Sequence, residues 1–384
     1  MVWRDFTYFM EIAQLYYPIY LLIVSLFSIQ IYGNYKKRIN PILGMQKRSL
    51  DVECIILMFF MILFIGLRPV SGRYFGDMAN YAASYHALYE NVPFIFNPNA
   101  ENVIWDNWWA LWGSMCLGTE TFFLLSAAIY FVCTYIACRK WFPNDTFIAY
   151  LFFLSAFSTF SFTTNGCKAG NAAALFLVAM AYRDKLYVCI PFLLLSLGIH
   201  HSMKQPIVAF ILASLYKNPK MYFAVWGMCV LISLAHITWF QNLFAQISAD
   251  NGDAHGANYL LGSDTNGWGG KSGFRFDFVL YSAMPIWVGY YAIYKKKIKS
   301  ASYNFVLNTY TVLNSVWMLC MYAEFTNRIA YFSWFMYPFV LIYPLVCENW
   351  GIQKYRTLSK IMLYHLGFTL FMQIIYYNTL LILM

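Results

Sequence analysis

Four basic side chains of this sequence could together bind a diphosphate. Arg68 and Arg73 lie close together in the first quarter of the chain, and Lys168 and Arg328 follow further on. A planar guanidinium group donates two hydrogen bonds to phosphate oxygens while it stays charged, which suits it to this task. Each cation also has a structural alternative, either a charge held at a membrane surface or an ion pair, which for Arg328 would be with Glu324.

Three further residues could transfer a proton. His200 and His201 follow an apolar run, and a neutral imidazole at the end of a helix can accept a proton from an incoming hydroxyl. His200 is the first choice for this role and His201 the second. Asp77 could act as the base, orient an arginine or bind hydroxyl groups. The structural alternatives are a backbone hydrogen bond for His200, and a helix cap or an ion pair with Arg73 for Asp77.

The sequence lacks the motifs of several enzyme classes. It contains no GxSxG, no HExxH, no P-loop and no dinucleotide-binding glycine pattern. Its nine cysteines form no CxxC pair and show no metal-ligand spacing, so we expect them to be small buried hydrophobes. We therefore predict no metal site, no cofactor and no nucleotide substrate.

The composition requires contact with lipid. Hydrophobic residues make up 61% of the chain and charged residues only 11%, with a mean hydropathy of +0.52. A soluble domain carries about 25% charged residues, so this chain could not cover an aqueous surface. The net charge of +9 is sorted by membrane topology, and we do not interpret it as nucleic-acid binding. We predict an all-α, polytopic transmembrane bundle that forms a single integral membrane domain over residues 1–384.

The apolar segments predict about twelve spans, because a helix needs about 20 apolar residues to cross the hydrocarbon core. Ten or eleven spans are the alternatives if the short fifth and seventh segments are partial or re-entrant. The expected spans are residues 12–33, 52–69, 121–138, 146–163, 170–182, 186–200, 204–216, 221–240, 276–294, 303–323, 329–347 and 361–383.

The distribution of basic residues predicts how these spans are oriented in the membrane. Lys and Arg concentrate in the first connection, residues 34–48, and in every second connection after it, while most acidic residues fall in the others. Cytoplasmic loops are enriched in Lys and Arg. We therefore expect the basic connections to be cytoplasmic, both termini to be extracytoplasmic, and the candidate side chains to lie at the outer face.

Two of the outer connections are long. The first, residues 70–120, contains the segment IWDNWWALWG, whose tryptophan spacing favours an amphipathic helix in the membrane interface. The second, residues 241–275, is rich in Gly, Asn and Asp and is typical of a mobile surface loop or lid.

Short motifs along most of the chain resemble the EpsG/Wzy-type family of bacterial polysaccharide polymerases. A Leu-Arg pair, a Gly-Asp pair and a tyrosine come first, followed by Asn-x-x-Lys, His-x-Ser and a late Asn-Arg pair. In this sequence they are Leu67, Arg68, Gly76, Asp77, Tyr81, Asn165, Lys168, His200, Ser202, Asn327 and Arg328. Lys168 stands where we would expect arginine, which keeps the charge but loses the bidentate geometry.

The resemblance implies a metal-independent glycosyltransferase of the bacterial cytoplasmic (inner) membrane, acting in the synthesis of O-antigen, capsule or exopolysaccharide. The donor would be a chain growing on undecaprenyl diphosphate, and the acceptor a new lipid-linked repeat unit. The four cations would neutralise the departing diphosphate, and His200 or Asp77 would deprotonate the attacking sugar hydroxyl. Secondary contributors to the site would be Asn165, Tyr81, His201 and Glu324. A chain-length regulator is a candidate partner.

Three other functions compete with this one. A glycosyltransferase that uses a polyprenyl-phosphate sugar would also place an acidic residue such as Asp77 in the first outer loop, but its monophosphate needs fewer cations. A lipid-linked oligosaccharide flippase or other transporter would carry charges in the middle of several helices, whereas here they collect at helix ends. An acyltransferase is suggested by His200 and His201 alone.

Overall fold

The chain is helical throughout the part that the structure describes. A computed structural model describes residues 2–36, 45–250, 254–261, 273–324 and 326–376, and these residues form helices with no strand among them. The all-α prediction is therefore confirmed. The helices divide into two compact units, the first comprising Met1–Lys204 and Leu345–Met384 and the second Gln205–Pro344.

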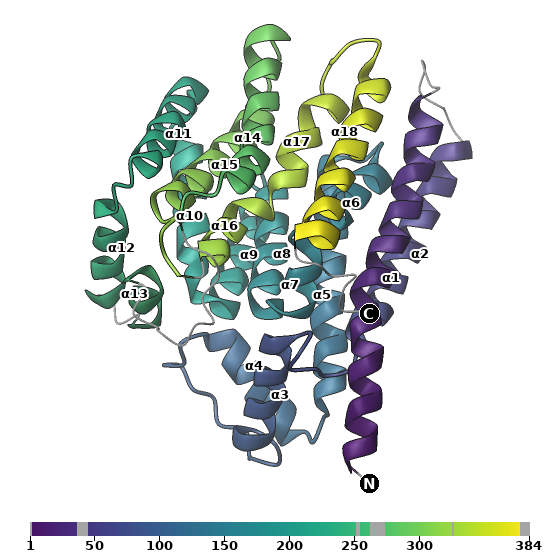
Figure 1. Cartoon of the computed structure of the whole chain (residues 1–384), viewed down its shortest axis with the longest axis vertical. Helices are drawn as coiled ribbons and strands as arrows, with labels where there is room; N and C mark the ends of the chain where they lie inside the picture. Colours follow the sequence, from purple (N-terminus) through teal and green to yellow (C-terminus); the bar gives the residue numbers. More distant parts are fainter. Residues whose placement is uncertain (1, 37–44, 251–253, 262–272, 325, 377–384) are drawn as a thin grey trace. The chain divides into compact units, whose positions relative to one another are not determined.

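The first unit contains long apolar helices that pack against one another (Figure 1). In that unit α1 packs against α18, α2 against α5, and α8 against both α5 and α9. Small residues allow α8 to approach its neighbours closely, since a Cβ atom added at Gly170 would collide with the backbone of Phe162. The helices of the first unit are α1 (Val2–Lys36), α2 (Met45–Gly66), α3 (Gly76–Leu88), α4 (Val103–Ser114), α5 (Thr119–Trp141), α6 (Thr146–Leu154), α7 (Thr159–Thr164), α8 (Cys167–Ala181), α9 (Leu186–Ile199), the 3-10 helix η1 (His201–Met203), α18 (Lys354–Leu370) and the π-helix η3 (Phe371–Tyr376).

Hydrogen bonds from indole groups join helices of the second unit. The Trp334 Nε1–H donates to the Ser282 hydroxyl at 2.8 Å, and the Trp226 Nε1–H donates to the Asn314 side chain at 2.8 Å. Helix packing joins α11 to α15, α12 to α13 and α15 to α16. The helices are α10 (Lys204–Leu215), α11 (Pro219–Leu234), α12 (Trp239–Asp250), α13 (Ala254–Leu261), α14 (Phe276–Tyr290), the π-helix η2 (Tyr291–Lys295), α15 (Ala301–Leu319), α16 (Thr326–Trp334) and α17 (Tyr337–Val346).

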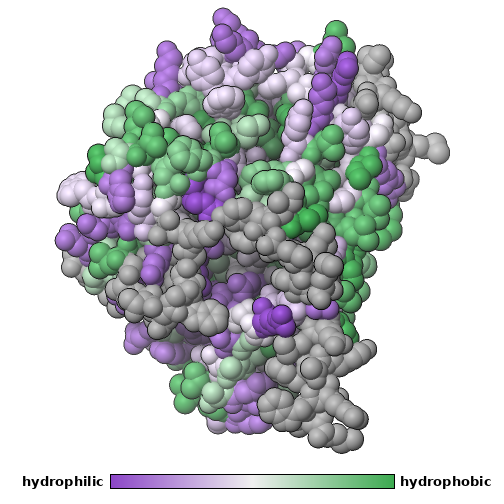
Figure 2. All heavy atoms as spheres, in the orientation of Figure 1, coloured by the Kyte–Doolittle hydropathy of each residue, from purple (hydrophilic) through white to green (hydrophobic). Residues whose placement is uncertain are grey.

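Within the described residues, three helical segments are long and apolar enough to cross a membrane, namely Ile12–Gly33, Thr119–Trp141 and Thr326–Val346. A fourth is added if Pro219–Leu234 and Trp239–Ala249, which meet at a bend of 101°, form one broken span. The count of twelve spans is not confirmed, because many of the expected segments form shorter helices. Large apolar side chains are nevertheless exposed along α2, α11 and α14, and hydrophobic residues cover much of the surface seen in Figure 2, as contact with lipid requires.

The expected span 146–163 is in fact two helices, α6 and α7, separated by a break after Leu154. Each carbonyl freed at the end of α6 accepts a hydrogen bond from a side chain, so the break costs little inside an apolar core. The donors and acceptors are His365 to Phe152 (3.0 Å), Thr159 to Phe153 (2.6 Å), Tyr20 to Leu154 (2.5 Å) and Thr369 to Ser155 (2.8 Å).

Both long connections contain helices. The first holds α3 and α4, and α4 covers the tryptophan-rich segment. Trp105 and Trp109 of α4 are buried against Phe122 of α5. These two rings therefore pack α4 against α5. The second connection contains most of α12 and all of α13, which pack together, so it is not a simple loop where it is described. Residues 251–253 and 262–272 lie outside the described residues.

The exposed cysteines allow the predicted orientation to be tested. Cys116 is exposed and follows α4 in the connection expected outside, whereas Lys299 lies in a basic connection expected inside. We expect a membrane-impermeant maleimide to label Cys116 in intact cells and a Cys116→Ser variant to lose this labelling. A Lys299→Cys substitution, made with Cys116→Ser and Cys347→Ser, should react only after permeabilisation. Labelling of both positions from the same side would contradict the topology.

Candidate functional site

Arg68 connects the end of α2 to the end of α7. Its side chain is buried, with an exposed fraction of 3%. One terminal nitrogen donates to the carbonyl of Ile65 at 2.6 Å and the other to the carbonyl of Thr164 at 2.8 Å. The guanidinium group also lies over the rings of Phe75 and Phe123, at 5.6 Å and 5.5 Å from their centroids. Both terminal nitrogens therefore bind backbone, and the buried Nε–H makes no hydrogen bond among the described residues.

Asp77 and Asn165 meet at the start of α3. The Asp77 backbone N–H donates to the Asn165 side-chain oxygen at 2.7 Å. The helix needs this partner because its N-cap residue, Phe75, has no side chain that can accept the free N–H groups. Asp77 lies in the first turn of α3, where the helix dipole stabilises a carboxylate. The structure therefore brings together two of the predicted residues that are far apart in the sequence.

Lys168 lies in the first turn of α8, and its charge acts on Asp106 in the first turn of α4. Burial raises the pKa of the Asp106 carboxyl group, while a hydrogen bond from the Asn102 backbone N–H (3.1 Å) and the Lys168 charge partly oppose the rise. The sequence analysis missed Asp106. The spacing of Asn102 and Asp106 at the start of a helix could have identified the pair, because it places a carboxylate where it accepts a hydrogen bond from the preceding turn.

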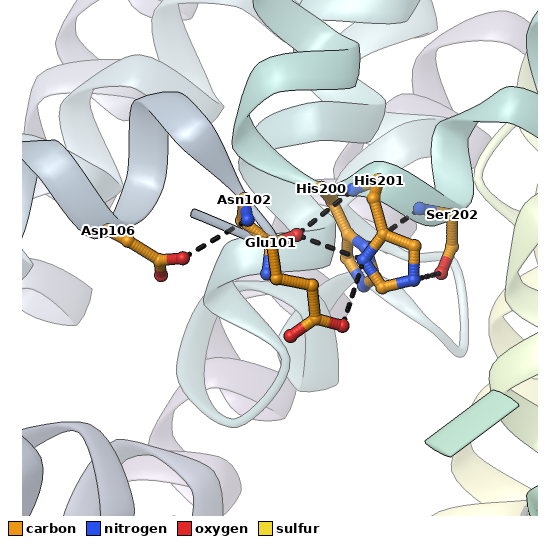
Figure 3. Close-up of polar contacts among 6 residues, drawn as sticks. All are labelled: Glu101, Asn102, Asp106, His200, His201 and Ser202. Carbon is orange, nitrogen blue, oxygen red and sulfur yellow. Dashed lines mark hydrogen bonds and ion pairs between the residues drawn. The ribbon is translucent and has the colours of Figure 1, made fainter. Parts of the chain in front are cut away.

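The two histidines make different contacts (Figure 3). His200 follows the last turn of α9, and its Nδ1 accepts a hydrogen bond from the Ser202 backbone N–H at 3.3 Å. The His201 backbone N–H donates to the Asn102 side-chain oxygen at 3.0 Å. The His201 Nδ1 lies 3.3 Å from that same oxygen and 3.3 Å from the Glu101 Oε1. We call Glu101, Asn102, Asp106, Lys168 and His201 the histidine cluster; Glu101 and Asn102 were not predicted to belong to the site.

Two other predicted residues of the first unit lie beside this region. Tyr81 packs edge-on against Trp105, with their ring centroids 5.5 Å apart, and so helps to join α3 to α4. Arg73 is exposed, its guanidinium group lies over the ring of Tyr74, and it makes no ion pair with any described carboxylate. The ion pair considered for Arg73 and Asp77 is therefore absent, and Arg73 can bind an anion.

Arg328 and Glu324 belong to the second unit. Arg328 is exposed on α16. The Glu324 Oε2 is buried and has no hydrogen-bond partner among the described residues.

The helical architecture and the exposed apolar side chains along the helices indicate a membrane protein. The EpsG family model matches residues 52–383, and the chain belongs to the EpsG family. Membership of this family indicates a membrane polysaccharide polymerase, a glycosyltransferase-like enzyme that acts on lipid-linked glycans. No curated protein and no solved structure matches the chain.

The contacts of Arg68 predict that its replacement mainly affects stability. Arg68→Ala would leave the Thr164 carbonyl without its side-chain donor and the Ile65 carbonyl with only the longer bond from the residue 68 backbone N–H (3.4 Å), and Arg68→Lys could not reach both carbonyls. We expect each variant to lower the free energy of unfolding by about 2 to 4 kcal/mol, measured on the purified protein in detergent. Arg73→Ala, at an exposed arginine nearby, should leave stability unchanged. If Arg68→Ala unfolds like the wild type, Arg68 is not a structural residue.

Proposed function

We propose that this protein polymerises oligosaccharide repeat units carried on undecaprenyl diphosphate at the outer face of the cytoplasmic membrane. The observation that carries the proposal is the histidine cluster, where the His201 imidazole contacts Glu101 and Asn102, and where the charges of His201 and Lys168 both act on the half-buried Asp106 carboxyl group. Membership of the EpsG family supports the reaction class.

The leaving group of this reaction is a diphosphate, which develops negative charge as the glycosidic bond breaks. Lys168 lies in the first turn of α8, where unpaired backbone N–H groups and the helix dipole also attract anions. Arg73 is an exposed cation of the same unit and would bind further phosphate oxygens. Arg328, an exposed cation of the second unit, stays a candidate from the sequence for the same task. Arg68 contributes by holding the loop after α2 in place, and its Nε–H is one further donor. Charge stabilisation of this kind is often the largest contribution to catalysis.

The nucleophile is a sugar hydroxyl of the lipid-linked acceptor. As its oxygen bonds to the anomeric carbon, the bond from that carbon to the diphosphate oxygen breaks, and the hydroxyl proton passes to a base. A histidine of the His200–His201 pair would take that proton, and Asp77 is the alternative base. A single displacement inverts the anomeric carbon. A double displacement needs a carboxylate nucleophile, for which Asp77 is our candidate.

Polymer length in cells tests this proposal. In a strain that lacks the native protein, wild type should restore a ladder of surface glycan, whereas Lys168→Ala and Arg328→Ala should leave single repeat units displayed outside. We expect a loss of about 100-fold in polymer at matched protein levels, because each variant removes charge stabilisation of the leaving group. Gel profiles of lipid-linked and surface glycan provide the measurement.

Matched variants separate charge from folding. Lys168→Arg keeps the charge and should keep most of the polymer, and Lys140→Gln removes a lysine whose nearest acid, Asp184, lies 3.7 Å away at the surface. Lys140→Gln should behave as wild type. Normal polymer in the absence of the protein, or repeat units that accumulate on the cytoplasmic side, would exclude a polymerase and favour transport.

A further inference from the structure

We propose that His201, and not His200, accepts the proton from the attacking hydroxyl, and that Glu101 and Asn102 are the residues that position it. This inference rests on the proposed glycosyl transfer, and it assigns one nitrogen atom, the His201 Nε2, to the proton-transfer step. The sequence alone favoured His200. The hydrogen-bond partners of the two rings reverse that order.

His200 is held in the form that cannot act as the base through Nε2. A neutral imidazole has one N–H group and one nitrogen with a lone pair. The Ser202 backbone N–H can only donate, and it lies 3.3 Å from the His200 Nδ1, so Nδ1 carries the lone pair. The proton of the neutral ring is then on Nε2. The His200 Nε2 is then a hydrogen-bond donor, while its Nδ1 accepts the Ser202 N–H group of η1.

His201 is held in the opposite form. Its Nδ1 faces two oxygen acceptors, the Glu101 carboxylate and the Asn102 side-chain oxygen, each at 3.3 Å. The oxygen of Asn102 is identified by the His201 backbone N–H, which donates to it at 3.0 Å. The Nδ1 must therefore carry the proton, and Nε2 has the lone pair. The Ser202 hydroxyl, 3.4 Å from Nε2, marks a position from which a hydroxyl group can donate to it.

Proton transfer to this nitrogen balances the reaction. The acceptor hydroxyl gives its proton to the His201 Nε2 as its oxygen bonds to the anomeric carbon, and the diphosphate leaves with the electron pair of the broken bond. The ring becomes an imidazolium, and the Glu101 carboxylate at Nδ1 stabilises that charge, as an acidic partner does for other catalytic histidines. The charged neighbours of the ring also include Asp106, while Lys168 acts on Asp106 in turn.

Asn102 can position His201 because it is itself fixed. Its side chain has an exposed fraction of 2%, and its backbone N–H donates to the Asp106 Oδ2 at 3.1 Å. Asn102 is the N-cap residue of α4, a place where asparagine usually binds the free N–H groups of its own helix. Here the side chain makes no such bond and instead accepts from His201. This contact joins the first long connection to the start of η1.

The first test is spectroscopic and does not depend on activity. We would label the histidines with ¹⁵N in the full-length protein in lipid nanodiscs and assign the two rings by difference with His200→Asn and His201→Asn. The expected result is a proton on Nδ1 in His201 and on Nε2 in His200. Glu101→Gln and Asn102→Ala should move part of the His201 population to the Nε2–H form. A His201 ring protonated on Nε2 in the wild type would overturn the inference.

The second test compares two matched substitutions in the polymerisation assay. His201→Asn keeps a donor near the Nδ1 position but has no Nε2, and we expect it to lower polymer formation about 100-fold or more, the usual contribution of a general base. His200→Asn keeps an acceptor for the Ser202 N–H, and its loss should stay below about tenfold. His86→Asn removes an exposed histidine 2.8 Å from the Glu90 carboxylate and should behave as wild type.

The outcomes distinguish the two proposals. A larger loss in His200→Asn than in His201→Asn would assign the base to His200 and overturn this inference while leaving the polymerase intact. If wild-type protein supports no polymer, the proposed function fails. The positions of the ring protons would still show whether Glu101 and Asn102 orient His201.

Discussion

A break in an apolar helix leaves backbone groups that lipid cannot hydrogen-bond, so side chains of the protein must bind them. The first unit meets this requirement repeatedly. Tyr20, His365 and two threonines donate to the carbonyls at the end of α6, and Arg68 donates to the carbonyls of Ile65 and Thr164. Because these donors come from distant parts of the chain, each break also becomes a place where separate segments are joined.

The candidate site is built from such junctions. Asn165 binds a free N–H of α3, His200 binds an N–H of η1, and Asn102 accepts the N–H of His201. Each of these side chains accepts a backbone N–H group at a helix end. The same hydrogen bond holds a candidate site residue in position. The geometry of the histidine cluster therefore depends on the same hydrogen bonds that allow short helices to exist in apolar surroundings.

Sequence reasoning was most successful where the signal is local. The tryptophan-rich segment forms the helix predicted for it, and the apolar segment 12–33 is long enough to span. It was least successful at helix breaks, because the apolar character of residues 146–163 continues across the gap between α6 and α7 and hides it. Asp106 was missed for a related reason. Its importance comes from Lys168 and Asn102, and only the second of these is a neighbour in the sequence.

The sequence by itself determined the class of this protein, an all-helical membrane protein of the EpsG family, because composition and short motifs are properties of the chain alone. It also predicted ionisable residues that could act on a diphosphate and a hydroxyl. Only the tertiary structure decided what each of them can do. The protonated nitrogen of His201 depends on Glu101 and Asn102, and the donors of Arg68 depend partly on Thr164. These partners lie far away in the sequence, and only folding brings them within hydrogen-bonding distance.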